Sequence, residues 1–388
     1  MCKICHLAVL SGITLIAQIP AQASSGPNGP STVPLTVFQV VSAPNQHQPF
    51  PANNYLNAIS YSSPSDMWAV GASTIHFDGQ QWTAFSAPDI SGAGTNALTG
   101  VADLSPDNVW AVGYINEDTE GQNPSAIVEH FNGTLWQMFS SPQFPATDQV
   151  FLRSITAISP TDIWAGGSDF EDPFEFPLLE HFDGTAWTQF SPPVSDCAVS
   201  GISADATNDV WASGVTLGGG TCILHYDGTG WQSVSSPDGC CGYNYLFGIV
   251  ALGPNNVWAA GWYIQNPNDD RPNLTLIERW DGSSWQIVTS PNVGPSGQVS
   301  SLLRGITAVS ANDIWAFGTS IDINSDAAST LLLHWNGSSW AIFPSPNVEL
   351  DGILNDYLLG GTVLPGRDIW IVGSNDVADT LVIHSTEH

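Results

Sequence analysis

The chain has 388 residues, of which 43% are hydrophobic and 11% are charged, so it can bury a sizeable core. Only 6 Lys and Arg stand against 36 Asp and Glu, and the formal net charge at pH 7 is -30. A surface this acidic repels phosphate backbones and anionic lipids, which argues against nucleic acid as a partner. A cation, a neutral polymer such as a glycan, or a basic protein remains compatible with it.

The first 23 residues have the pattern of a secretory signal. A basic start, MCKICH, precedes a short apolar stretch, and Ala21-Gln22-Ala23 provides small residues for cleavage. We expect cleavage near Ala23 and a secreted product, extracellular or periplasmic. The apolar run is too short to span a bilayer, and no later segment approaches about 18 uninterrupted apolar residues, so we expect no membrane insertion.

Removal of the signal would also remove Lys3, the only lysine. An acidic habitat would favour such a composition because carboxylates protonate there and repel each other less. Drift in composition explains it equally well. We expect residues 24–34 to be a linker and residues 35–388 to form a single domain.

Two tryptophan positions recur along that domain. The first follows Asp or Asn and one aliphatic residue or Met, and it occurs at Trp68, Trp110, Trp164, Trp211, Trp258, Trp315 and Trp370. The second closes a string ending (Asp/Asn)-Gly-x-x-Trp, at Trp82, Trp136, Trp187, Trp231, Trp285 and Trp340. A period near 50 residues indicates a stacked or radial array of repeats.

Each repeat reads as four strands. An apolar residue, typified by Leu56, lies twelve positions before every first Trp, and a small residue follows two positions later. A tight turn such as SPSD separates this innermost strand from the strand that carries the Trp. An Asp-Gly or Asn-Gly pair then predicts a two-residue hairpin between the third and fourth strands. Proline follows six residues after the second Trp and ends an edge strand.

The two ends of the chain hold complementary parts of one repeat. The seventh copy stops near His384, before a fourth strand, whereas FQVVSAP at Phe38–Pro44 matches WQIVTSP at Trp285–Pro291. We therefore predict an all-β fold, a seven-bladed β-propeller of four-stranded blades whose last blade is closed by the N-terminal strand. A linear solenoid is the alternative, but it would need polar caps. Length varies only in connections that leave one face, where binding is expected, and we expect a monomer.

Four cysteines follow the signal: Cys197, Cys222, Cys240 and Cys241. An even number in an exported chain predicts two disulfides. Because adjacent cysteines rarely bridge each other, we expect Cys197 and Cys222 to pair with Cys240 and Cys241, in an order left open. A metal site is the rival interpretation.

The DVWAVG-like strings and HYDGTGW at His225–Trp231 resemble the repeats of exported bacterial β-propellers, including the photosystem II assembly-factor type and the wider sialidase-like, Asp-box propellers. The resemblance covers residues 35 to 388 and implies the fold. An Asp-box has Asp-x-Gly-x-x-Trp, whereas Asp78 is followed directly by Gly79, so the motif is imperfect.

Residues repeated in every blade are predicted to be scaffold. The histidines at His76, His130, His181, His225, His334 and His384 cannot converge on one ion, and we expect structural stacking or hydrogen bonding, with Arg279 substituting in the fifth repeat. The aspartates before the first Trp are expected to cap turns. In contrast, Asp322, Asn324 and Asp326 alternate in one loop and can aim three oxygens at Ca²⁺.

The candidate binding residues depart from the repeat. Tyr243, Tyr245, Trp262 and Tyr263 lie in or beside variable loops near the cysteines, together with Phe170 and Phe174. Aromatics and acids on a braced loop face suit sugar stacking, although they also suit plain loop packing.

Arg153 and Arg304 share one repeat position and would line the channel mouth. These features predict a binding or interaction scaffold for a glycan or protein at the cell surface. An extracellular carbohydrate-active enzyme, a sialidase-like hydrolase or a lyase, is the alternative. It would need a third cation or an acid pair beside the arginines, and acid neighbours such as Asp169 and Glu171 leave that open.

Overall fold

The computed structural model describes residues 36–45, 54–88, 96–115, 124–142, 144, 148–171, 174–191, 193–240, 242–265, 272–295, 297–350, 353–375 and 379–387. The predicted signal (1–23), the linker (24–34) and Cys241 lie outside these residues. No helix in the described part is long and apolar enough to cross a bilayer.

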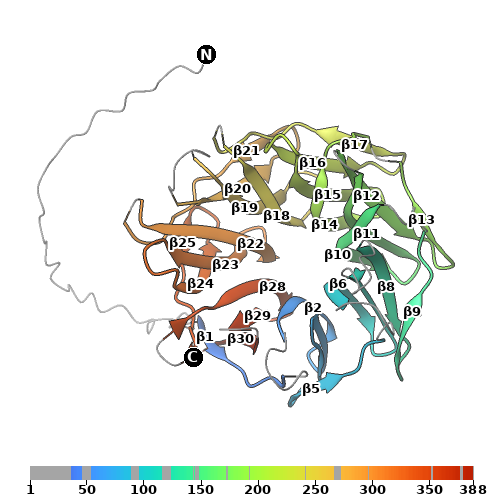
Figure 1. Cartoon of the computed structure of the whole chain (residues 1–388), viewed down its shortest axis with the longest axis horizontal. Coiled ribbons are helices and arrows are strands. Elements are labelled where there is room, and N and C mark those ends of the chain that lie inside the picture. Colours follow the sequence, from blue (N-terminus) through green and yellow to red (C-terminus); the bar gives the residue numbers. More distant parts are fainter. Residues whose placement is uncertain are drawn as a thin grey trace, which may run out of the picture. The chain divides into compact units, whose positions relative to one another are not determined.

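Seven four-stranded antiparallel sheets are arranged in a ring (Figure 1), and their innermost strands line a central channel. In blades 1 to 3 the strands are β2 (Leu56–Ser63), β3 (Asp66–Gly71), β4 (Thr74–Phe77) and β5 (Trp82–Phe85); β6 (Asn96–Ser105), β7 (Asn108–Ile115), β8 (Ser125–Phe131) and β9 (Trp136–Phe139); and β10 (Gln149–Ser159), β11 (Asp162–Glu171), β12 (Phe174–Phe182) and β13 (Trp187–Gln189). Each blade runs outward from the channel in chain order.

Blades 4 to 6 repeat this order. Their strands are β14 (Ala198–Ala206), β15 (Asp209–Val215), β16 (Thr221–Tyr226) and β17 (Trp231–Val234); β18 (Asn244–Ala251), β19 (Val257–Tyr263), β20 (Leu274–Trp280) and β21 (Trp285–Ile287); and β22 (Val299–Ser310), β23 (Asp313–Asp322), β24 (Ala328–Trp335) and β25 (Trp340–Ile342). A short hairpin, β26 (Glu349–Leu350) and β27 (Ile353–Leu354), precedes blade 7.

Blade 7 joins the two ends of the domain, as predicted. It consists of β28 (Tyr357–Leu364), β29 (Asp368–Asn375), β30 (Asp379–Glu387) and the N-terminal β1 (Thr36–Val40). β1 pairs antiparallel with β30, from Thr36 opposite Glu387 to Val40 opposite Ile383. The ring therefore closes by strand pairing, in which β1 covers the outer side of β30 and becomes the edge strand of blade 7.

Tryptophan contacts between neighbouring blades form the core. The first Trp of each blade meets the second Trp of the next, with ring centroids 5.2 to 5.8 Å apart, and the pairs are Trp68–Trp136, Trp110–Trp187, Trp164–Trp231, Trp211–Trp285, Trp258–Trp340 and Trp370–Trp82. At the closing blade Phe38 of β1 takes the tryptophan's place against Trp315 at 5.4 Å. These tryptophans are therefore structural, since each buries a large aromatic ring between two blades.

The hairpins between third and fourth strands are longer than predicted. Phe77 pairs with Trp82, so four residues separate the strands, beginning with Asp78 and Gly79. Asp78 Oδ1 accepts hydrogen bonds from the N–H groups of Gln80 and Gln81, and Gly79 has a φ of 91°. Only the glycine adopts positive φ; the aspartate caps the turn.

Candidate functional site

Every innermost strand carries a β-bulge at the same repeat position. The register shifts by one residue between the buried residue twelve positions before the Trp and the small residue that follows it. A bulge adds one unpaired residue and redirects its side chain. The seven bulge residues are Asn57, Thr99, Arg153, Ser200, Phe247, Arg304 and Leu359, and all of them line one cavity of about 660 Å³. We call them the bulge ring.

A glycine in each second strand makes room for the bulge. Gly261 pairs with Leu246, and a Cβ on Gly261 would lie 1.8 Å from the carbonyl oxygen of Tyr245. The equivalent glycines, Gly71, Gly113, Gly167, Gly214, Gly318 and Gly373, show the same approach at 1.8 to 2.1 Å. The glycine that ends each DVWAVG-like string therefore allows the close backbone approach that the bulge requires.

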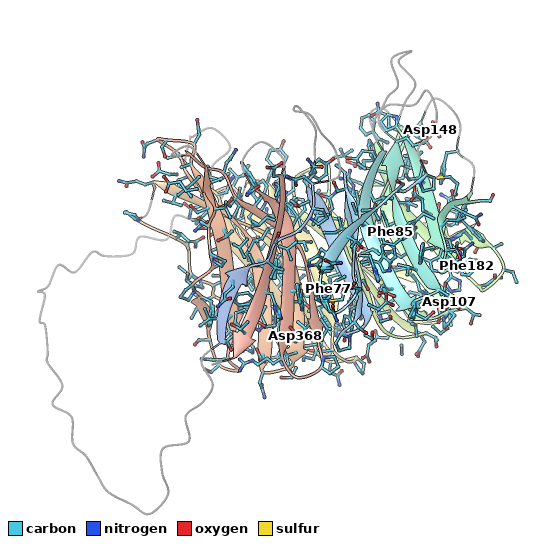
Figure 2. All side chains as sticks on the ribbon, turned by 90° about the horizontal axis from the view of Figure 1, so that it is seen from below. Phe77, Phe85, Asp107, Asp148, Phe182 and Asp368 are labelled. Carbon is cyan, nitrogen blue, oxygen red and sulfur yellow. A yellow bond between two sulfur atoms is a disulfide. The ribbon has the colours of Figure 1, made fainter. Side chains whose placement is uncertain are left out.

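The cavity lies at the end of the channel on the loop-bearing face. Its lining includes Tyr55 and Tyr357 at the starts of innermost strands, and Tyr114 and Ser374 near the ends of second strands. Figure 2 shows the two faces: Asp107 and Asp368, at or beside tight turns, lie at one end of the blades and Asp148 lies at the other. The face with variable connections is thus the one that carries the cavity.

Both predicted arginines reach the cavity, from blades 3 and 6. Arg153 donates to Ser168 Oγ at 3.3 Å and lies 3.7 Å from Glu175. Arg304 lies over the ring of Phe247, 4.6 Å from its centroid, and forms no ion pair within the described residues. Burial lowers the pKa of Arg304, although Tyr357 acts in the opposite direction. No carboxylate is among the described residues that line this cavity.

A ladder of aromatic rings leads from the rim to Arg304. Tyr243, Tyr245 and Phe247 stack in sequence, with centroids 6.2 and 5.9 Å apart and interplanar angles of 21° and 16°. Trp262 flanks this ladder, 4.3 Å from Tyr245 and 6.1 Å from Phe247. Tyr243 is 43% exposed at its outer end. We call these four residues the aromatic ladder.

Other predicted aromatics lie elsewhere. Tyr263 follows Trp262 on the same strand and therefore points to the opposite side, where it packs on the core between blades 4 and 5. Phe170 pairs with Gln149 and Glu175 in blade 3. The structure thus brings Tyr243, Tyr245 and Trp262 together beside Phe247 and Arg304. Arg153 lines the same cavity from blade 3, and Tyr263 lies outside the group.

The predicted calcium loop forms a tight turn after β23. Asp322 Oδ1 accepts the N–H groups of Asn324 and Ser325 at 2.8 and 3.2 Å, and these bonds lower the pKa of Asp322. Asp326 has a φ of 56°. One carboxylate oxygen of the predicted ligand set is thus occupied by the turn itself.

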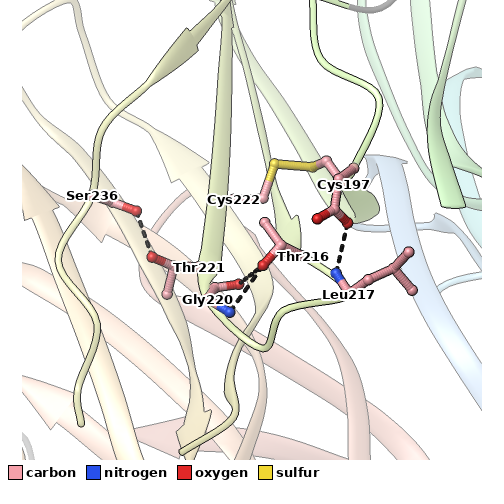
Figure 3. Close-up of a disulfide and its surroundings, with 8 residues drawn as sticks. Cys197, Thr216, Leu217, Gly220, Thr221, Cys222 and Ser236 are labelled. Atoms are coloured by element: carbon pink, nitrogen blue, oxygen red, sulfur yellow. Dashed lines mark hydrogen bonds between the residues drawn. A yellow bond between two sulfur atoms is a disulfide. The ribbon is translucent and has the colours of Figure 1, made fainter. Parts of the chain in front are cut away.

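The disulfide prediction was wrong in its pairing. Cys197 bonds to Cys222, with Cα atoms 5.9 Å apart, and not to Cys240 or Cys241 (Figure 3). Both cysteines belong to blade 4, because Cys197 immediately precedes β14 and Cys222 lies at the start of β16. The bond clamps the loop end of that blade, where the Thr216–Gly220 turn is fixed by Leu217 N–H donating to Asp196 Oδ1.

The repeated histidines are structural, as predicted, and the aspartates have a different role. Asp209 Oδ1 accepts from Trp211 Nε1 at 2.7 Å and contacts His225 Nε2 at 2.8 Å, so it holds two side chains and does not cap the turn. His225 stacks on Trp211 at 4.0 Å. Arg279 replaces the histidine in blade 5, 5.2 Å above Trp258, as predicted.

Five members of the bulge ring escaped prediction: Asn57, Thr99, Ser200, Phe247 and Leu359. They occupy the same repeat position as Arg153 and Arg304, and this shared position could have identified them from the sequence. Thr99 and Asn57 donate to the carbonyl oxygens of Leu152 and Leu98 in the next blade, so part of the ring also ties blades together.

No family model matches the sequence, and no curated protein matches it. Solved structures match its fold. A structure described as YCF48 bound to D1 peptide has a TM-score of 0.55 and 12% identity over 89% of this chain and 94% of that one. YCF48 from Cyanidioschyzon merolae gives 0.54 and 14% over 89% and 98%, and a chain of the mitotic checkpoint complex gives 0.52 and 11% over 97% and 99%. The chain is therefore a propeller similar in fold to YCF48.

Proposed function

We propose that this protein is a secreted binding module that holds an acidic glycan at the loop-face mouth of its channel. One observation carries the proposal: the aromatic ladder ends at Arg304, so a row of aromatic rings lies directly beside a cation that lines the cavity. Aromatic rings suit the apolar faces of sugars, and a guanidinium binds a carboxylate through two parallel hydrogen bonds.

The charge distribution supports an anionic group at this place. The chain as a whole carries -30, which repels an acidic ligand from most of the surface. The cavity is an exception, because two arginines and no described carboxylate line it. A ligand carboxylate would give Arg304 the anionic partner that the described chain lacks, in a site where burial strengthens the interaction.

A peptide is the second candidate ligand. The structure of YCF48 bound to D1 peptide has the same fold, which makes a peptide partner worth testing here. A peptide with aromatic side chains and a free carboxylate would use the same ladder and the same arginines. The enzyme alternative would need a third cation or an acid pair beside the arginines.

Array binding separates these candidates. Purified protein is screened against acidic glycans, neutral glycans and carboxylate-terminated peptides, with and without calcium. We expect binding to acidic glycans, strongly reduced by Tyr245→Ala and by Arg304→Gln. Tyr263→Ala is the matched control, since Tyr263 faces the opposite side of β19. Binding to peptides alone would replace the glycan with the second candidate, and binding that survives both ladder variants would overturn the proposed site.

A further inference from the structure

Three carboxylates converge at the loop end of blade 3, outside the channel cavity. Asp169 and Glu171 lie two residues apart on β11 and therefore face the same side, and Asp148 immediately precedes the paired strand β10. Each contributes an oxygen, and these oxygens all lie within 4.8 Å of one another. Figure 2 places Asp148 at the loop-bearing end of the blades.

Asp169 is the unusual member of this group. Its side chain is buried, with the residue only 8% exposed, yet its Oδ1 has no hydrogen-bond partner among the described residues. A buried carboxylate oxygen without a donor is costly, and like-charged neighbours add to the cost. Burial, and after it the nearby carboxylates of Asp148 and Glu171, raises the pKa of Asp169 to about 6.

We infer that Asp148, Asp169 and Glu171 bind a calcium ion. Hard carboxylate oxygens are the ligands that Ca²⁺ prefers, at about 2.3–2.6 Å. Two oxygens on opposite sides of such an ion lie about 4.6–5.2 Å apart, so a cluster within 4.8 Å can share one ion. Glu171 is exposed, which leaves room for waters to complete the coordination. The ion offsets two of the three negative charges and gives the unpaired Asp169 oxygen a partner.

The ion would brace the part of blade 3 that positions Arg153. Ser168, which accepts a hydrogen bond from Arg153, directly precedes Asp169 on β11. Calcium at the cluster connects the loop-face end of β11 to the segment that precedes β10, the strand that carries Arg153. The calcium site itself does not depend on the proposed glycan binding.

Titration calorimetry with calcium chloride tests the site without any glycan. The purified protein, freed of cations by a chelator, should bind one Ca²⁺ per chain, and its melting temperature should rise with calcium. Asp169→Asn keeps the shape of the buried side chain and should weaken binding at least about tenfold, because the site loses one of three charged ligands. Glu171→Gln changes an exposed residue, so it gives the same reading should Asp169→Asn fail to fold.

Asp322→Asn is the matched control, because an asparagine oxygen can still cap that turn while the charge is lost. It should leave calcium affinity unchanged. No calcium binding in the unmodified protein would overturn the inference. So would affinity that is retained by both Asp169→Asn and Glu171→Gln, or lost in Asp322→Asn.

Discussion

One carboxylate or amide oxygen in most blades organises a tryptophan and a histidine together. In blade 4 Asp209 Oδ1 contacts both Trp211 Nε1 and His225 Nε2. In blade 2 Asn108 Oδ1 does the same for Trp110 and His130, both at 2.9 Å. This position therefore needs a hydrogen-bond acceptor oxygen but does not need a negative charge.

This equivalence yields a prediction for two substitutions. Asp209→Asn should leave the free energy of unfolding nearly unchanged, as Asn108 already fills the same role. Asp209→Ala should lower it by about 1–3 kcal/mol because the buried Trp211 N–H loses its acceptor. Urea unfolding followed by tryptophan fluorescence measures both. Equal losses in the two variants would show that the charge matters and not the acceptor.

At the residue scale the sequence predicted which side chains are scaffold but not their partners. His225 and Asp209 are 16 residues apart, and only the pairing of β15 with β16 brings Trp211 opposite His225. The turn next to Asp209 suggested a local cap. The true partners depend on strand register, which the tryptophan spacing does not specify.

Among the elements, the bulged innermost strand decides what the channel presents. The unpaired residue turns toward the channel because the opposite glycine lets the backbone approach closely. Strand positions followed from the fixed spacing of leucine and tryptophan. The bulge could not be predicted from this spacing, because the extra residue interrupts the alternation by one position only and leaves no separate mark in the hydrophobic pattern.

Substituting the glycine opposite a bulge should destabilise the fold. In Gly261→Ala the new Cβ meets the Tyr245 carbonyl oxygen, so either the bulge or the strand must shift. We expect a loss of about 1–3 kcal/mol or more in the free energy of unfolding, measured by chemical denaturation. Gly230→Ala is the control, because nothing lies within 4 Å of a Cβ there and the change should stay within about 0.5 kcal/mol. Similar effects of both substitutions would contradict the role given to the glycine.

Across the whole molecule, buried acids make stability depend on pH. Glu129, Glu180 and Glu278 are fully buried without hydrogen-bond partners among the described residues, and burial raises the pKa of each to about 8. They lie at equivalent positions on third strands, where blades 4 and 6 carry Leu224 and Leu333. An acidic working environment, one of two explanations for the lack of lysine after the predicted signal, would keep these glutamates protonated.

The sign of the pH effect follows from proton binding. Between the unfolded pKa near 4.5 and the folded value near 8, the native state holds protons that the unfolded chain has released. The free energy of unfolding should therefore fall as pH rises through this window, by up to about 1.4 kcal/mol per pH unit for each group. Urea midpoints at pH 5 and pH 7.5 measure the difference.

Glu180→Leu, which copies the leucine found at the equivalent position of blade 4, should raise the pH 7.5 midpoint more than the pH 5 midpoint. A midpoint in the original protein that is equal or higher at pH 7.5 would show that burying these acids does not destabilise the fold as they ionise.

Ring closure was the part of the molecule that the sequence predicted best. The distance from the aromatic residue to the proline is the same in Phe38–Pro44 and in Trp285–Pro291, which indicates an edge strand in both segments. Phe38–Pro44 precedes the first repeat, so this strand had to complete another blade. The disulfide was predicted poorly, since cysteine spacing carries no information on which strand ends meet in space. The calcium cluster was hidden for the same reason: Asp148 and Asp169 are 21 residues apart and meet only through the pairing of β10 with β11.

In the proposed function, Arg304 at the end of the aromatic ladder holds the carboxylate of the ligand. The most direct test is titration calorimetry with the best acidic oligosaccharide from the array, comparing Arg304→Gln with Arg367→Gln. Arg367 already pairs with Asp313 at 2.7 Å and does not line the cavity, so it is a matched arginine control. We predict at least about tenfold weaker binding for Arg304→Gln, or about 1.4 kcal/mol, and no change for Arg367→Gln. Unchanged affinity in Arg304→Gln would contradict the claim.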